Sequence, residues 1–149
     1  QNISHLGFSL FILSILFNNL FSTEVITNLK VGETFSSDKF NIKFEKLSQK
    51  KIENYQSIIG KFTIENSNGI IEIMNPELRI YNQPKISTSE ADIKTDFFSD
   101  RFITMNIVQN QEYFNVRYQT KPLMIWIWLS TLLIALGGIT SFFKKKYES

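Results

Sequence analysis

The sequence predicts an α+β membrane protein, in which two transmembrane helices flank an extracytoplasmic antiparallel β-sandwich or partly open β-barrel. Two uncharged apolar segments, one near each end of the 149-residue chain, predict the helices. Between them, apolar residues alternate with polar ones, which is typical of half-buried strands. The predicted order is a transmembrane helix (residues 1–23), a β-rich domain (24–121), a second transmembrane helix (122–143) and a basic tail (144–149).

The first apolar segment carries no Asp, Glu, Lys or Arg before Glu24. About 20 helical residues cross the hydrocarbon core of a bilayer, so this segment is long enough to span it. A cleaved signal peptide is the alternative, and it would need a basic region first and a small residue before the cut. The first lysine is Lys30, and Leu20 stands where the small residue would be needed. A transmembrane helix is favoured. Because the chain begins with Gln1, we interpret it as processed or as part of a longer protein.

The second apolar segment is followed directly by Lys144, Lys145 and Lys146. Basic residues beside a span favour the cytoplasmic side, so the tail is predicted to be cytoplasmic. The loop between the spans is too long for its own charges to set the orientation. With two spans, the β-rich domain then lies in the periplasm or an equivalent space.

The β-rich domain contains several stretches with the period of two that strands require. They cover residues 25–31, 40–44, 58–64, 71–73, 103–107 and 114–118. The turn from Asn66 to Gly69 predicts one hairpin, and a connection through Asn110 predicts another. About six short strands in a domain of this size imply a sandwich or a partly open barrel. Residues 82–96 are polar and contain Pro84, so we expect a long connection with one helical turn.

Composition excludes several classes of site. The chain has no cysteine, which removes disulfides, thiol catalysis and cysteine-ligated metals. A net charge of +2 gives no reason to expect nucleic-acid binding. Four loop acids, Glu90, Asp92, Asp96 and Asp100, lie close in sequence, but they lack the spacing of a calcium loop and are expected to be solvated. The sequence contains no recognisable catalytic motif, so we predict a binding or scaffolding domain without catalytic residues.

His5 is the only histidine, and it lies near the start of the first predicted helix. Neutral imidazole is a common axial ligand of haem iron, and histidines in membrane helices are candidates for function. Helical spacing places Ser9 and Ile12 on roughly the same face. From these residues alone, a polar residue at the membrane interface remains the more frequent interpretation.

The second apolar segment contains two further features. Trp126 and Trp128 lie near its start, where tryptophans usually form the aromatic belt of a membrane protein. Gly137 and Gly138 permit close approach of another helix. We therefore expect the second helix to pack against partner helices in a larger bundle.

Several short motifs occur along the chain in a recognisable order. They are Arg117-Tyr118, Lys121-Pro122, Trp126-Ile127-Trp128, Ala135-Leu136-Gly137-Gly138, Pro76-Glu77-Leu78-Arg79-Ile80-Tyr81, Ser89-Glu90-Ala91-Asp92-Ile93, His5-Leu6-Gly7, Phe21-Ser22-Thr23-Glu24 and Lys30-Val31-Gly32-Glu33-Thr34. Together they resemble the C-terminal part of the CcmF family, the haem lyase component of cytochrome c maturation. The resemblance covers nearly the whole chain. It departs from the family at Ser130, where glycine is usual, at Ile134, where methionine is common, and over residues 104–110, where a glycine-containing pattern is expected. A paralogous lyase subunit dedicated to nitrite reductase maturation would look similar.

The resemblance implies a multi-pass protein of the bacterial inner membrane, or of the mitochondrial one, of which this chain is the C-terminal part. It implies that His5 is an axial ligand of a membrane haem b, with the second ligand supplied by a part of the protein outside this chain. It also implies partners: the haem chaperone CcmE, CcmH and apocytochrome c. The family delivers, reduces and covalently attaches haem to apocytochrome c, as a component of a haem lyase complex. This segment alone is not expected to be catalytic.

An alternative from another class remains open. The chain would then be a membrane-tethered β-domain that acts as an adaptor or sensor without a cofactor. It would fold with its two helices alone and carry no pigment.

Overall fold

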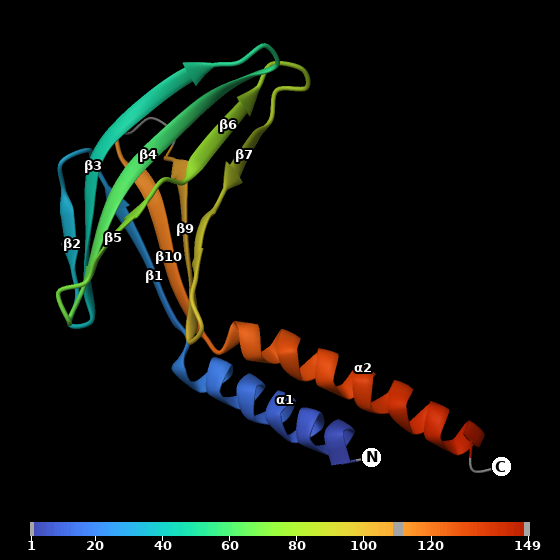
Figure 1. Cartoon of the computed structure of the whole chain (residues 1–149). Helices are drawn as coiled ribbons and strands as arrows, with labels where there is room; N and C mark the ends of the chain where they lie inside the picture. Colours follow the sequence, from blue (N-terminus) through green and yellow to red (C-terminus); the bar gives the residue numbers. More distant parts are fainter. Residues whose placement is uncertain (1, 109–111, 148–149) are drawn as a thin grey trace. The chain divides into compact units, whose positions relative to one another are not determined.

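The computed structural model describes residues 2–108 and 112–147, and it contains two long helices and a β-sandwich (Figure 1). The chain divides into two compact units, which are described separately. One unit holds Gln1–Thr23, Thr95–Asp100 and Thr120–Ser149, and the other holds Glu24–Lys94 and Arg101–Gln119. The prediction of two long apolar helices flanking a β-sandwich is confirmed, and two open sheets replace the alternative of a partly open barrel.

The helices are α1 (Asn2–Phe21) and α2 (Met124–Tyr147). Both contain a stretch long and apolar enough to cross a membrane, Asn2–Phe21 and Met124–Phe143. They run side by side in opposite directions, because the start of α1 contacts the second half of α2 and the end of α1 contacts the residues just before α2 (Figure 1).

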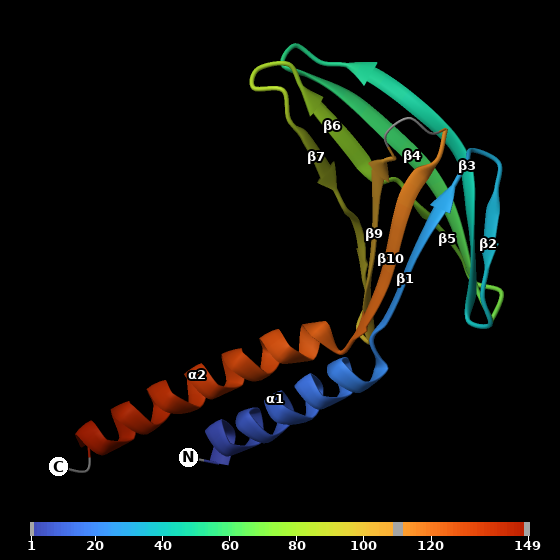
Figure 2. The same ribbon diagram turned by 180° about the vertical axis from the view of Figure 1, so that it is seen from behind.

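The described residues form ten strands in two sheets, which face each other in Figure 2. The first sheet has the order β1-β10-β9-β8 and the second the order β2-β3-β4-β6-β7, with β5 paired to β4. The strands are β1 (Thr23–Leu29), β2 (Thr34–Ser36), β3 (Phe40–Lys51), β4 (Tyr55–Asn66), β5 (Ile71–Met74), β6 (Glu77–Tyr81), β7 (Ser87–Glu90), β8 (Asp92–Thr95), β9 (Ser99–Ile107) and β10 (Phe114–Pro122).

The core of the sandwich consists of the apolar members of the alternating stretches. Phe44 and Phe62 are fully buried and stacked, with their ring centroids 4.4 Å apart. Gly60 on β4 leaves room between the sheets, because a Cβ built there would lie 2.7 Å from Sδ of Met105 on β9. A β-bulge between Phe44 and Lys46 resets the register of β3 against β4, so that Leu47 again points inward opposite Gly60.

Two hairpin predictions have different outcomes. The Asn66–Gly69 turn joins β4 to β5, with Gly69 at φ 73° and the Asn66 side chain accepting hydrogen bonds from the backbone N–H groups of Asn68 and Ile70. That hairpin is confirmed. Strands β9 and β10 are neighbours as predicted, but the connection through Asn110 lies outside the described residues.

The expectation for residues 82–96 was wrong, because this segment contains β7 and β8 rather than a helical turn. Strand β7 pairs with β6 in the second sheet, and β8 belongs to the first sheet, so the chain changes sheets around Ala91. The Ser89 hydroxyl bridges the change by donating to the Met105 carbonyl at 2.9 Å. Both strands lie at sheet edges and are largely polar, so they lack the apolar alternation that the sequence analysis relied on.

Candidate functional site

The contact between α1 and α2 is made by small residues. Ser14 and Gly7 on α1 are buried, as are Ser130 and Gly137 on α2. A Cβ built at Gly137 would lie 2.6 Å from the backbone nitrogen of Ser4, and one built at Gly7 would lie 3.0 Å from backbone and side-chain atoms of α2. The helix backbones therefore approach closely, as small residues permit in membrane helices.

A side-chain hydrogen bond closes one end of this contact. Asn18 Nδ2 donates to the carbonyl of Pro122 at 2.7 Å, which ties the end of α1 to the start of α2. The buried hydroxyls of Ser14 and Ser130 donate to the carbonyls of Leu10 and Trp126 one turn earlier. The polar side chains at this contact are satisfied by backbone carbonyls, as burial in an apolar environment requires.

His5 lies on the face of α1 that α2 leaves uncovered. Its side chain is exposed, whereas Ser4 and Gly7 on either side contact α2. Ser9 and Ile12 are exposed on the same side as His5. The Ser9 hydroxyl donates to the carbonyl of His5 at 3.0 Å. That hydroxyl is thus used within the helix, and the imidazole is the group on this face that can bind a metal.

The exposed surroundings of His5 are mixed. Leu6 is 65% and Phe8 56% exposed, whereas the exposed neighbours one turn away, Asn2 and Ser9, are polar. An exposed neutral imidazole has the chemistry of an axial haem ligand. The chain has a single histidine, and the described residues contain no group of three or more His, Cys, Asp or Glu that could hold a metal ion by themselves.

The two tryptophans have different surroundings. Trp126 packs edge-on against Phe97, with ring centroids 4.8 Å apart, and its indole N–H donates to the Phe97 carbonyl at 3.1 Å. Trp128 is 67% exposed. The glycines also separate, since Gly137 contacts α1, whereas a Cβ at Gly138 would meet open space.

On the sandwich, a cluster of charged and aromatic side chains surrounds Arg79. Its guanidinium bonds Glu77 at 3.1 Å and lies 5.3 Å from the ring centroid of Tyr55. The ion pair with Arg79, opposed by partial burial and aided by Ser57, lowers the pKa of Glu77. The same hydrogen bond to Glu77 raises the pKa of Arg79, so both groups are charged at neutral pH.

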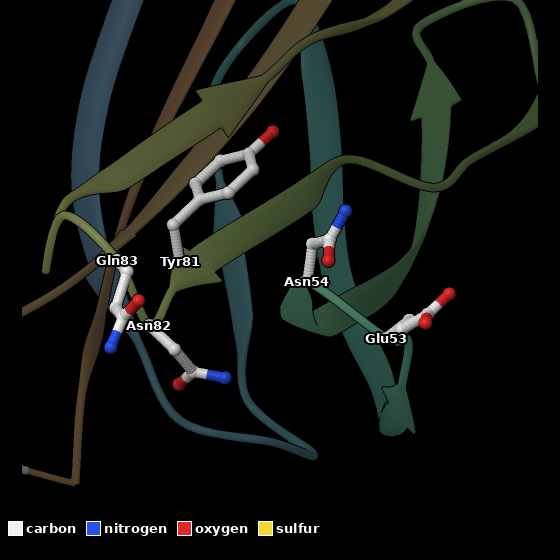
Figure 3. A pocket seen from close by; sticks show the side chains of 5 residues that line it. All are labelled: Glu53, Asn54, Tyr81, Asn82 and Gln83. Atoms are coloured by element: carbon white, nitrogen blue, oxygen red, sulfur yellow. The ribbon is translucent and has the colours of Figure 1, made fainter.

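A polar hollow of about 430 Å³ lies between two turns at one end of the second sheet (Figure 3). It is lined by Glu53, Asn54, Tyr81, Asn82 and Gln83. The side chains are open to solvent and carry no nucleophile paired with a base. The hollow therefore provides hydrogen-bonding groups but not the constellation of a catalytic site.

The four loop carboxylates do not form a site. Asp92 accepts a hydrogen bond from the backbone of Asn75 at 2.6 Å, and Asp96 caps the turn that follows it. Glu90 lies 3.7 Å from Arg79. These three carboxylates serve the local structure. The sequence analysis missed the ion pair that joins Arg101 of β9 to Glu72 of β5 through two contacts of 2.8 and 3.2 Å.

Comparison with known proteins identifies the family. The model of the CcmF C-terminal β-sandwich matches residues 20–122, which is more than half of the chain. The chain belongs to the CcmF family. It is therefore part of a cytochrome c biogenesis protein, and the resemblance found in the sequence is confirmed.

Relatives agree over nearly the whole chain. The cytochrome c-type biogenesis protein CcmF of Haemophilus influenzae is 30% identical over 148 residues, covering 98% of this chain and 22% of the relative. CycK of Bradyrhizobium diazoefficiens is 25% identical and covers 93% of this chain and 21% of the relative. NrfE of H. influenzae, also a cytochrome c-type biogenesis protein, is 24% identical, and the match covers 98% of this chain and 23% of the relative. The chain thus spans about a fifth of the length of these CcmF-type relatives.

A solved structure has the same fold. The chain resembles the cytochrome c haem lyase CcmF with a TM-score of 0.68 and 17% identity, covering 92% of this chain and 23% of that one. The matched residues 20–122 begin at the end of α1, contain the described strands β1 to β10 and end before α2.

Proposed function

We propose that this chain is the C-terminal part of a membrane-embedded haem-handling protein, in which His5 is one axial ligand of a haem b. The position of His5 carries the proposal. The only histidine of a CcmF-type chain is exposed on a helix face that points away from α2. An exposed imidazole there can coordinate the iron of a haem that is held between α1 and other helices.

The same geometry supports a location for the haem. Ser4 contacts Gly137, so His5 lies level with the second half of α2 and close to the end that carries Lys144–Lys146. The positive-inside rule favours the cytoplasm for that end, so we propose that His5 lies in the inner half of a bacterial inner membrane and that the sandwich is periplasmic. A mitochondrial inner membrane would give the equivalent arrangement.

The division of work follows from these placements. The contact between α1 and α2 fixes the rotation of α1 and so the direction of the imidazole. Haem b bound there would supply a one-electron carrier that reduces the haem to be attached. The sandwich contributes surface for the partners expected of a CcmF-type protein, namely CcmE, CcmH and apocytochrome c. Delivery, reduction and covalent attachment of haem belong to the whole complex, and the described residues provide no catalytic group.

The test is to coexpress the chain with the remainder of a CcmF-type protein and to record the reduced haem b spectrum. We expect His5→Gly to abolish the haem b signal and added imidazole to restore part of it. Asn19→Gly, at another exposed polar position of α1, is the matched control and should retain the haem. Haem b that stays bound and reducible in His5→Gly would refute the ligand assignment and favour the adaptor without a cofactor.

A further inference from the structure

The turn between β8 and β9 exposes two adjacent aromatic rings. Phe97 is 51% and Phe98 69% exposed. Asp96 fixes the turn from inside, because its Oδ1 accepts hydrogen bonds from the N–H groups of Phe98 and Ser99, both at 2.8 Å, while its own N–H donates to the carbonyl of Ser99. The turn is therefore a built structure that presents two phenyl rings outward.

The turn is fastened to the start of α2 within the same compact unit. Leu123, the residue before α2, donates its N–H to the Phe98 carbonyl at 2.8 Å. Trp126 donates its indole N–H to the Phe97 carbonyl, and its ring packs against that of Phe97. These bonds satisfy two carbonyls of the turn. Satisfied carbonyls lower the cost of bringing Phe97 and Phe98 into a less polar environment.

Exposed apolar side chains also cover the first turns of α2. The first turns of that helix expose Trp128, and Leu132 is 59% exposed one turn further. Aromatic side chains at the end of a membrane span favour the boundary between headgroups and acyl chains. The candidate span Met124–Phe143 begins one residue after Leu123, so the turn lies where that boundary is expected.

We propose that the β8–β9 turn inserts Phe97 and Phe98 into this boundary of the lipid bilayer, and that Trp126 holds it there. The inference rests on the proposed membrane insertion of α2. In this proposal the β8–β9 turn contacts the membrane in addition to the two helices, and Trp126 holds the turn in place through its contacts with Phe97.

The test uses spin labels, which is straightforward because the chain has no cysteine. Single variants Phe98→Cys, Phe97→Cys, Leu132→Cys and Glu53→Cys are labelled and reconstituted in phosphatidylcholine vesicles, alone and with the remainder of a CcmF-type protein made cysteine-free. Accessibility to oxygen, which enters lipid, is compared with accessibility to a water-soluble nickel chelate. Leu132 gives the hydrocarbon reference, and Glu53, which lines the polar hollow, gives the aqueous one.

We expect the labels at positions 97 and 98 to have an oxygen-to-nickel ratio several-fold above that of position 53 and below that of position 132. A ratio equal to that of position 53 would overturn the inference while leaving the membrane insertion of α2 intact. Protection from both reagents in the assembled protein would also overturn it, because protein rather than lipid would then cover the turn. An aqueous reading at position 132 would refute both the inference and the proposed span. Circular dichroism of each variant verifies that the sandwich is folded.

Discussion

The helix pair and the sandwich bury opposite kinds of residue. Between α1 and α2 the buried residues are Ser14, Ser130 and two glycines, while leucine, isoleucine and phenylalanine side chains cover the outside. In the sandwich, phenylalanine, isoleucine and methionine fill the interior, while lysines and acids occupy the outer faces. This difference indicates that the sandwich is suited to water and the helix pair to lipid. Burial of large apolar groups stabilises a fold in water, whereas close backbone packing stabilises helices in lipid, where apolar side chains gain nothing by leaving the solvent.

A substitution in the aromatic core of the sandwich should cause the largest change in stability. Phe62→Ala removes a fully buried ring that stacks on Phe44, so the free energy of unfolding should fall by about 3–5 kcal/mol. Denaturant unfolding in detergent, followed by near-ultraviolet circular dichroism, measures this change. The matched substitution Phe8→Ala, at a ring of α1 that is 56% exposed, should change the same quantity by less than about 0.5 kcal/mol. Equal effects would contradict the assignment of the two environments.

A smaller change is expected when the contact between the two helices is altered. Gly137→Leu places a side chain against the backbone of Ser4 and should weaken the pairing of α1 with α2 by about 1–3 kcal/mol. Gly138→Leu is the matched control, because a side chain there meets open space. Spin labels at Ile3→Cys and Phe142→Cys should show a broadened distance distribution with Gly137→Leu only. An unchanged distribution would show that close packing does not hold the pair together.

The smallest effect concerns the charged surface of the sandwich. Arg79 lowers the pKa of Glu77 below its ordinary value of 4.5, so this carboxylate stabilises the fold above that pH, and the contribution is lost as the pH falls through the lowered value. The contribution is below about 1 kcal/mol, because the pair is partly exposed. Glu77→Gln should flatten this part of the acid unfolding curve. Arg79→Gln should have the same effect, and a steeper acid limb in either variant would contradict the pairing.

The sequence predicted those parts of the fold in which hydrophobic pattern and environment agree. The uncharged segments predicted both helices, and the alternation from Phe40 and from Ile58 predicted the central strands. Polar edge strands such as β7 could not be predicted, because their stability comes from backbone pairing with β6 rather than from an apolar face.

The candidate site was predicted in its chemistry but not in its geometry. A lone histidine near a helix start was visible in the sequence, whereas its exposure opposite α2 depends on which face carries Ser4, Gly7 and Ser14. Likewise, Gly137 and Gly138 both suggested helix contacts, but only Gly137 faces α1. The fastening of Trp126 to Phe97 joins residues 29 positions apart, and no local pattern in the sequence signals it.

The proposed role of His5 is tested most directly by identifying the axial ligands of the haem. Near-infrared magnetic circular dichroism of the oxidised, assembled protein distinguishes imidazole from thioether as an axial ligand of low-spin haem. With His5→Met, we expect the haem to remain bound while one of its axial ligands changes from imidazole to thioether. A spectrum identical to that of the unmodified protein would mean that both ligands come from elsewhere, and the proposed role of His5 would be wrong.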